Sequence, residues 1–463
     1  MAGDARAAPD TGRVAGGGMR RPGRIRSALL DVYRLGPGAI WRWLHTQPAS
    51  FWWVTLYLFI EYVRPQQLFP SIDVVPYGQI TLGFTLLSLL LGRERLRPYS
   101  SADGALGVYA LIVLLSTATA YMPMESISNY IFFFSWVLVY FLITNIVVTE
   151  KRFVVFMLAF LLYNAQMSWG AMKQWAGFGF GFRTWGVTGG AGWFNNSGEF
   201  GVAMCIFFPV AFYFALGLKD RLPKWKFLVL LAMAGSAVLG TVASSSRGAL
   251  VGIAAAGMWM LVKSKYRVRA LIAAAALVVV VLVLLPPEQK QRFSEAGEDK
   301  SSVTRLTYWR RGVQMTEDYP VLGIGFFNWM PYYQRTYGVK GQLPHNIFIQ
   351  ASAELGFTGL AAFLGLIGVT LLVNRRTRAR AARAPNGRLV FLMAHSFDAA
   401  LMGYLASGFF VTVLYYPFFW INLSMTVALS EVARRELVPA PARAVLRGRQ
   451  ALVTALPPSA RRA

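Results

Sequence analysis

Apolar runs of about 20 residues recur along most of the chain, and a run of that length can cross the ~30 Å hydrocarbon core of a bilayer. Of the 463 residues, 56% are hydrophobic and only 14% are charged, and the mean hydropathy is +0.45. A soluble protein of this size carries roughly a quarter charged residues. The sequence therefore predicts an all-α polytopic membrane protein. We expect about twelve spans, at roughly 50–64, 76–92, 104–121, 127–148, 152–171, 198–218, 225–243, 247–263, 268–286, 346–374, 388–409 and 413–432.

The formal net charge of +25 follows the predicted topology. The predicted spans put every second connecting segment on the same side of the membrane. The segments of one side, which include both chain ends, hold 34 of the 46 Lys and Arg residues. Basic residues gather on the cytoplasmic side of membrane proteins. An even number of spans then puts both termini in the cytoplasm. Topology accounts for the charge, so no nucleic-acid partner is implied.

Three regions follow from this topology. Residues 1–48 form a basic N-terminal segment, in which 24–46 suits either a helix lying on the cytoplasmic membrane surface or a solvated helix. Residues 49–433 form the transmembrane domain, and 434–463 form a basic cytoplasmic tail. The single cysteine, Cys205, lies in an apolar run, so no disulfide can form within the chain.

Two long loops are expected on the outer side. The first, at 172–197, is rich in Gly and Trp. Its tryptophans suit either a belt at the bilayer interface or stacking against sugar rings. The second, at 287–345 between spans nine and ten, is the longest polar interval of the transmembrane domain.

The outer ends of spans eight and ten carry candidate functional residues. Arg247 follows Ser244-Ser245-Ser246, so its guanidinium is expected beside the free N–H groups of a helix N-terminus. That combination suits the binding of a phosphate. The alternative is an arginine at a span end that only extends its charged group into the aqueous phase. His345 opens span ten on the same side, and the helix N-terminus and nearby arginines should keep it neutral and able to accept a proton. A plain surface histidine is the other interpretation.

The long loop contains an unbroken segment, 304–311, that is expected to be helical. It would place Arg305 and Trp309 on one face at i and i+4, with Arg310 and Arg311 pointing elsewhere. One of these arginines could face a site while another serves the surface.

Polar residues also occur inside the predicted spans. Glu61, Glu354, His395 and Asp398 could relay protons, but structural pairing is favoured, and His395 and Asp398 at i and i+3 could pair with each other. Motifs for nucleotide or metal binding do not occur in the sequence. We therefore expect neither a cofactor nor a metal.

Five motifs follow one another on the predicted outer face: Ser246-Arg247-Gly248, Arg305–Trp309, Asp318–Gly325, His345-Asn346 and Glu354–Gly359. In their order and spacing they resemble the O-antigen ligase/Wzy polymerase superfamily over about 180–375. The early residues 62–65, with Trp185-Gly186 and Asn195-Asn196, are also similar to the O-glycosylation ligases associated with exosortase systems.

The resemblance implies a fold of the GT-C kind and a metal-independent, inverting glycosyltransferase in the bacterial inner membrane, with its active site on the periplasmic side. The donor would be a glycan on undecaprenyl diphosphate, and the acceptor hydroxyl would belong to a glycan, a lipid or a protein. Arg247 and Arg305 would bind the diphosphate, together with or replaced by Arg310 and Arg311, and His345 would activate the acceptor. Such an enzyme would serve O-antigen, lipopolysaccharide or exopolysaccharide synthesis.

Two alternatives stay open at this point. A Wzy-type polymerase would use the same donor, and its loss would leave single lipid-linked repeat units where loss of a ligase leaves long chains. A transporter or flippase of twelve spans would show two related halves, which the sequence does not display. A membrane scaffold is less favoured than either.

Overall fold

The computed structural model describes residues 32–92, 94–181, 186–190, 192–264, 268, 272 and 300–437, and every regular element in these ranges is helical. The elements are η1 (Val32–Arg34), α2 (Pro37–Leu44), α3 (Ala49–Val63), α4 (Pro65–Leu68), η2 (Pro70–Ile72), α5 (Tyr77–Leu91), α6 (Ser101–Ala118), α7 (Pro123–Ile146), α8 (Glu150–Gly177), η3 (Gly192–Phe194), α9 (Ser197–Leu218), η4 (Lys219–Arg221), α10 (Lys224–Ala243), α11 (Arg247–Val262), α14 (Lys300–Asp318), α15 (Trp329–Tyr337), α16 (Ile347–Ala382), α17 (Arg388–Gly408) and α18 (Pro417–Glu436).

Eleven helices coincide with eleven of the predicted spans, and the remaining span, 268–286, lies outside the described residues apart from two single positions. Within the described ranges, seven helices are long and apolar enough to cross a membrane, and α5 and α11 are shorter apolar helices. The chain is thus an integral, all-helical membrane protein, whereas the total of twelve spans stays a prediction.

Polar caps fix where several of these helices begin. The Ser100 side chain accepts the N–H of Ala102, and the Ser100 backbone N–H donates to the Asp103 carboxylate, which makes a capping box at the start of α6. Asn196 caps α9 in a similar way. Proline occupies the first turn of α7 and α18, where a missing N–H costs nothing.

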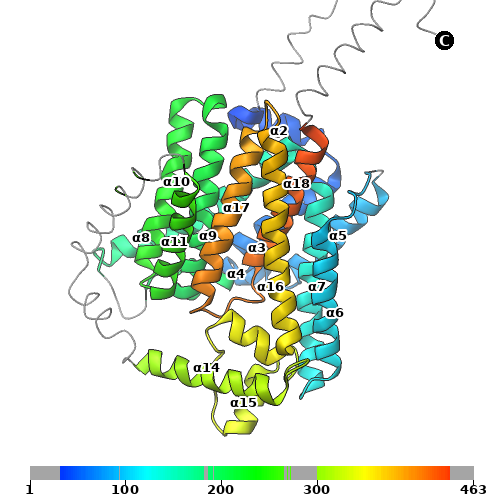
Figure 1. Cartoon of the computed structure of the whole chain (residues 1–463). Helices are drawn as coiled ribbons and strands as arrows, with labels where there is room; N and C mark the ends of the chain where they lie inside the picture. Colours follow the sequence, from blue (N-terminus) through cyan, green and yellow to red (C-terminus); the bar gives the residue numbers. More distant parts are fainter. Residues whose placement is uncertain are drawn as a thin grey trace, which may run out of the picture.

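The centre of the bundle is α9, which lies against α10, α11 and α17 (Figure 1). The thiol of Cys205 is buried there and donates to the carbonyl of Ala249 at 3.1 Å, as expected of a small buried side chain. Helix α18 is almost entirely buried although it is less apolar than its neighbours. Because it faces protein on all sides, its polar residues can be hydrogen-bonded there.

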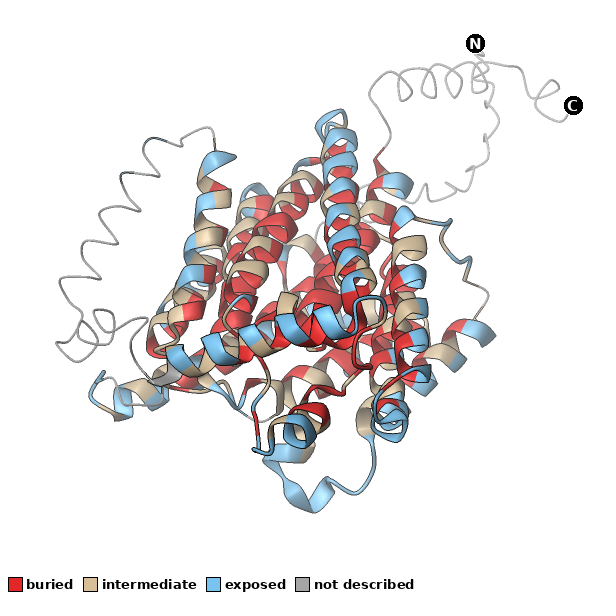
Figure 2. Cartoon of the chain, turned by 60° about the horizontal axis from the view of Figure 1, so that its bottom comes forward, coloured by how far each residue is buried: buried red, intermediate tan, exposed pale blue. Residues whose placement is uncertain are grey.

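One end of the bundle is covered by α14 and α15, and we call it the α14 face. Helix α14 crosses this end of the bundle, and the ends of α2 and α18 lie at the opposite end (Figure 1). One side of α14 is buried and the other exposed (Figure 2). The buried side packs with α15 in a small apolar cluster that includes Tyr308, Met315, Trp329 and Tyr333.

A kink at Gly356 divides α16, because its φ of 69° and ψ of −173° are not helical. The turn at Pro320–Gly325 binds the backbone groups that the kink frees. Ile324 N–H donates to the Ala353 carbonyl at 2.9 Å, and Phe357 N–H donates to the Pro320 carbonyl at 2.8 Å. The residues 347–355 before the kink are therefore held by the turn, and α16 continues through the bundle beyond it.

Of the polar residues inside predicted spans, the carboxylates of Glu61, Glu354 and Asp398 are paired. Asp398 forms an ion pair with Arg378 and accepts a hydrogen bond from Asn374 at 2.8 Å. The suggested pairing of Asp398 with His395 is therefore wrong, because the closer guanidinium of α16 takes the carboxylate. His395 instead packs its ring against Phe391, with ring centroids 4.9 Å apart.

Candidate functional site

His345 lies on the α14 face, immediately before Asn346, which caps α16. Its backbone is left-handed, with φ of 52°, and its N–H donates to the Thr412 hydroxyl at 2.8 Å. Its Nε2 lies 3.5 Å from the Gln342 side-chain oxygen. Burial, and secondly the charge of Arg305, lower the pKa of His345 to about 4. The imidazole is therefore neutral near pH 7 and can accept a proton, as the sequence predicts.

The neighbours of His345 hold this unusual backbone in place. The indole N–H of Trp309 donates to the Pro344 carbonyl at 2.9 Å. The Asn346 side chain accepts the N–H groups of Phe348 and Ile349 at 2.9 and 3.2 Å. A left-handed non-glycine residue persists only where its surroundings determine it. His345 is thus fixed on both sides, by a cap and by an indole.

Helix α14 confirms the predicted helical segment and separates its three arginines. Arg305 is partly buried and close enough to His345 to lower its pKa. Arg310 is exposed. Arg311 donates to the Tyr333 hydroxyl, and its guanidinium lies 4.1 Å from the ring centroid of Tyr337. Of the three, Arg305 is the one whose charge acts on the histidine, and Arg311 is engaged by tyrosines.

Arg247 begins α11, as expected, and is partly buried. The Ser246 side chain accepts the N–H of Ala249 at 3.3 Å. Gly248 allows close packing here, since a Cβ at this position would lie 2.8 Å from the Cβ of Phe410. The N-terminus of α11 therefore abuts the connection between α17 and α18.

That connection, Phe409–Tyr416, links the parts of the site, and we call it the 409–416 loop. Phe410 packs on Gly248 beside Arg247, while Thr412 holds the His345 N–H. The same loop ends at Tyr416, whose hydroxyl donates to Glu199 at 2.7 Å. Arg247 and His345 therefore border one short loop, although 98 positions separate them in the sequence.

Glu354 is buried behind His345 and helps to anchor this loop. It accepts hydrogen bonds from the Tyr415 hydroxyl at 2.9 Å, the Gln350 amide at 3.3 Å and the Trp329 N–H at 3.4 Å. The Glu354 carbonyl also accepts from Ser116 at 2.9 Å. Glu354 is thus a structural acceptor, as favoured from the sequence.

Sequence reasoning missed the residues of the 409–416 loop. Thr412 falls at the short break between two predicted spans, Tyr415 lies just inside the second of them, and neither carries a motif. Their partners lie 67 and 61 residues away, so only the fold shows the relationship. The one local feature in the sequence is a set of hydroxyl side chains just before Pro417, which begins a helix, and this feature does not indicate a functional site.

The charge of Arg305 acts on His345, and Arg247 begins a helix that borders the same 409–416 loop as His345. Such an arrangement can stabilise a leaving diphosphate and accept a proton from an attacking hydroxyl. Groups of three or more His, Cys, Asp or Glu side chains that could hold a metal do not occur in the described part of the chain.

Two sequence families match the chain. Residues 42–217 match a family of unknown function (DUF5935), and residues 231–364 match the family described as O-Antigen ligase. The second match contains Arg247, Arg305 and His345. A search of curated proteins returns no significant match. Residues 231–364 thus match an O-antigen ligase domain, which supports the resemblance to the O-antigen ligase/Wzy superfamily.

Proposed function

We propose that the protein transfers a glycan from undecaprenyl diphosphate to an acceptor hydroxyl on the outer face of the bacterial inner membrane. The observation that carries this proposal is the partly buried, neutral His345, whose pKa the charge of Arg305 helps to lower, inside the segment that matches the O-antigen ligase family. The ligase activity is favoured over the polymerase activity because the matched family is described as a ligase.

The roles follow from the chemistry of the groups. Arg305 and Arg247 bind the diphosphate oxygens and stabilise the negative charge that builds up as the diphosphate leaves. His345 accepts the proton of the acceptor hydroxyl. The hydroxyl oxygen forms a bond to the anomeric carbon as the bond from that carbon to the phosphate oxygen breaks. The proton ends on the imidazole, undecaprenyl diphosphate leaves, and the anomeric configuration inverts.

Arg305 also links donor binding to the base. Its positive charge lowers the pKa of His345, so a diphosphate that neutralises that charge raises the pKa again. A higher pKa makes the imidazole a stronger base. The base is therefore strengthened when the donor is present.

The sidedness rests on the distribution of charge. The basic segments at 375–388 and 434–435 lie at the ends of α16, α17 and α18 that are opposite to the α14 face (Figure 1). Basic ends favour the cytoplasm, so the α14 face is the outer, periplasmic one. The donor and acceptor would then meet outside the cytoplasm.

The test uses the purified full chain in lipid nanodiscs with undecaprenyl-diphosphate glycan from a deletion strain. Arg247→Ala, Arg305→Ala and His345→Ala should each reduce transfer by about 100-fold or more, whereas Arg310→Ala, matched in residue type but exposed, should stay near wild type. Normal transfer by the first three folded variants would refute the site. Retention of the anomeric configuration in the product would refute the single displacement.

A further inference from the structure

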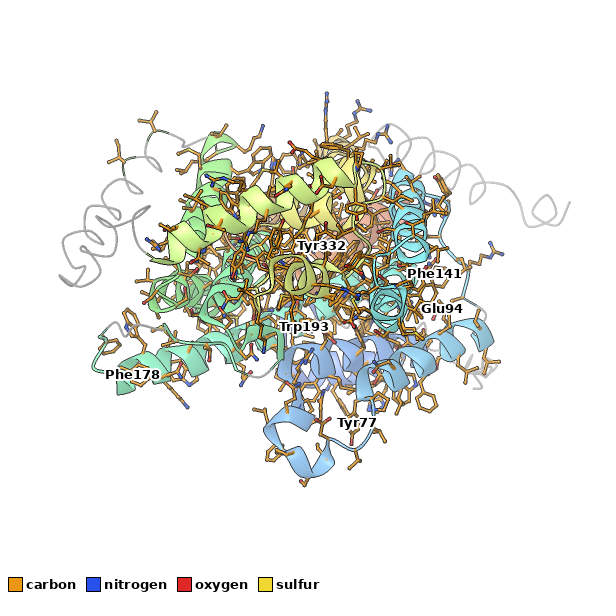
Figure 3. All side chains as sticks on the ribbon, turned by 90° about the horizontal axis from the view of Figure 1, so that it is seen from below. Tyr77, Glu94, Phe141, Phe178, Trp193 and Tyr332 are labelled. Atoms are coloured by element: carbon orange, nitrogen blue, oxygen red, sulfur yellow. The ribbon has the colours of Figure 1, made fainter. Side chains whose placement is uncertain are left out.

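A second group of polar and aromatic side chains lies on the α14 face, outside the site described above. Figure 3, seen from this side, shows Trp193 near the middle of the view. We call the group the Trp193 cluster. Its members come from α3 and the turn after it, α7, η3, α9 and the 409–416 loop: Glu61, Arg64, Phe132, Trp193, Glu199 and Tyr416.

The Trp193 ring is the centre of this cluster. The Arg64 guanidinium lies 5.0 Å from its centroid, the Tyr416 ring 4.7 Å and the Phe132 ring 5.4 Å. The indole N–H donates to Glu61, which also lies 3.6 Å from Arg64. All six side chains are partly exposed, so the cluster is open to a ligand.

The backbone is shaped to hold Arg64 against the indole. Arg64 is left-handed, with φ of 49°, and Gly192 has φ of 74°. A Cβ on Gly192 would overlap the Arg64 side chain. The Arg64 Nε is buried, with no hydrogen-bond partner in the part of the chain that the structure describes. Strained backbone together with an unmet buried donor is typical of a binding site rather than of an interfacial belt.

The chemistry of the cluster suits a sugar ring. Aromatic rings offer apolar faces to the C–H face of a pyranose, and the carboxylates of Glu61 and Glu199 accept hydrogen bonds from hydroxyls. Glu61 neutralises Arg64, so the cluster has no excess positive charge for a phosphate. A polyol fits these groups better than an anion does.

The 409–416 loop contacts both the candidate site and the Trp193 cluster, at successive positions along its length. Phe410 at its start packs beside Arg247, Thr412 holds His345, and Tyr416 at its end contacts Trp193 and Glu199. If the diphosphate lies at the start of the loop, the base is in the middle and the cluster is on the acceptor's side. We propose that the Trp193 cluster is the acceptor subsite and binds a sugar ring, so that the acceptor is a glycan; this rests on the proposed function.

The experiment measures transfer by the purified full chain to two acceptor fractions of the same strain, glycolipid and membrane protein. Transfer should go to the glycolipid and be lost after mild periodate treatment of that fraction, which cleaves vicinal diols of sugars. Trp193→Ala and Glu199→Gln should raise the acceptor KM about tenfold or more and the donor KM less than about twofold. Tyr416→Phe, which keeps the ring, tests the Glu199 contact in a variant expected to fold. Trp169→Ala, an exposed tryptophan of α8, is the control and should behave as wild type.

Transfer to polypeptide, insensitivity to periodate, or an unchanged acceptor KM in the folded variants would overturn this inference. If Arg305→Ala and His345→Ala still abolish transfer in that case, the proposed function stands without it. If the wild type transfers to neither fraction, both fail.

Discussion

The backbone N–H of His345 donates to the hydroxyl of Thr412, 67 residues later in the chain, at 2.8 Å. This contact joins the start of α16 to the connection between α17 and α18. It also fixes a left-handed histidine, a conformation that costs about 1–2 kcal/mol in a non-glycine residue. Thr412 is therefore a positioning residue for the proposed base.

Replacing Thr412 tests this role. Thr412→Ala leaves the His345 N–H without its acceptor and should lower kcat by about tenfold, with a loss of stability of roughly 1 kcal/mol. Thr412→Ser keeps the hydroxyl and should restore most of the rate. Initial rates and thermal unfolding of the three proteins check this, and equal rates for Ala and Ser would show that the contact has no effect on catalysis.

The three arginines of α14 should differ in the kind of defect they cause. Arg305→Ala should mainly reduce transfer, since the charge of this side chain acts on His345. Arg311→Ala should mainly lower the unfolding temperature, because it removes the contacts with Tyr333 and Tyr337 that hold α15 to α14. The measurement is transfer rate beside thermal unfolding for each variant. A rate defect of Arg310→Ala as large as that of Arg305→Ala would contradict this division.

The titration of His345 gives a test that does not depend on transfer. The chain has three histidines, so selective labelling of imidazole nitrogens gives few NMR signals, and His345→Gln assigns one of them. We expect His345 to become protonated only near pH 4. Arg305→Ala should raise this pKa, although not to 6.5, because burial is the larger cause.

The same pKa sets the direction of the pH dependence of catalysis. Protonated His345 cannot accept a proton, so kcat/KM should fall as the pH is lowered through about 4. In Arg305→Ala the fall should begin at a higher pH, together with the shifted NMR titration. A titration of wild-type His345 near 6.5 would show that its surroundings do not lower its pKa.

The kink of α16 depends on a glycine at position 356. Gly356→Ala places a Cβ at φ of 69° and against the Val321 carbonyl, so it should destabilise the protein by more than about 2 kcal/mol and reduce transfer. Gly365→Ala, two turns further along α16 in open space, is the matched control and should be neutral or slightly stabilising. Thermal unfolding compares them; similar Tm values would show that the kink is dispensable.

Local signals predicted most of the fold. Apolar runs and their caps place eleven of the predicted spans within a few residues of observed helices. The orientation of α14 across the end of the bundle and the kink at Gly356 were not predicted. Both depend on contacts between segments that are distant in the sequence, such as the hydrogen bond from Ile324 N–H to the Ala353 carbonyl.

The candidate site was predicted in part. His345 lies at the start of α16 and Arg247 at the start of α11, as expected from proline, serine and asparagine signals. The sequence could not separate Arg305, Arg310 and Arg311, because the tyrosines that engage Arg311 belong to α15. Thr412 and Glu199 carry no motif and become recognisable only through their partners.

The 409–416 loop has a consequence for exchanging parts between related proteins. The matched ligase domain ends at residue 364, inside α16, so it excludes the loop that holds His345 and packs beside Arg247. A chimaera that transfers only residues 231–364 would place His345, Arg247 and Arg305 next to a 409–416 loop that comes from the recipient protein. To transfer the activity from one relative to another, the exchanged segment would therefore have to include α17, α18 and the 409–416 loop between them.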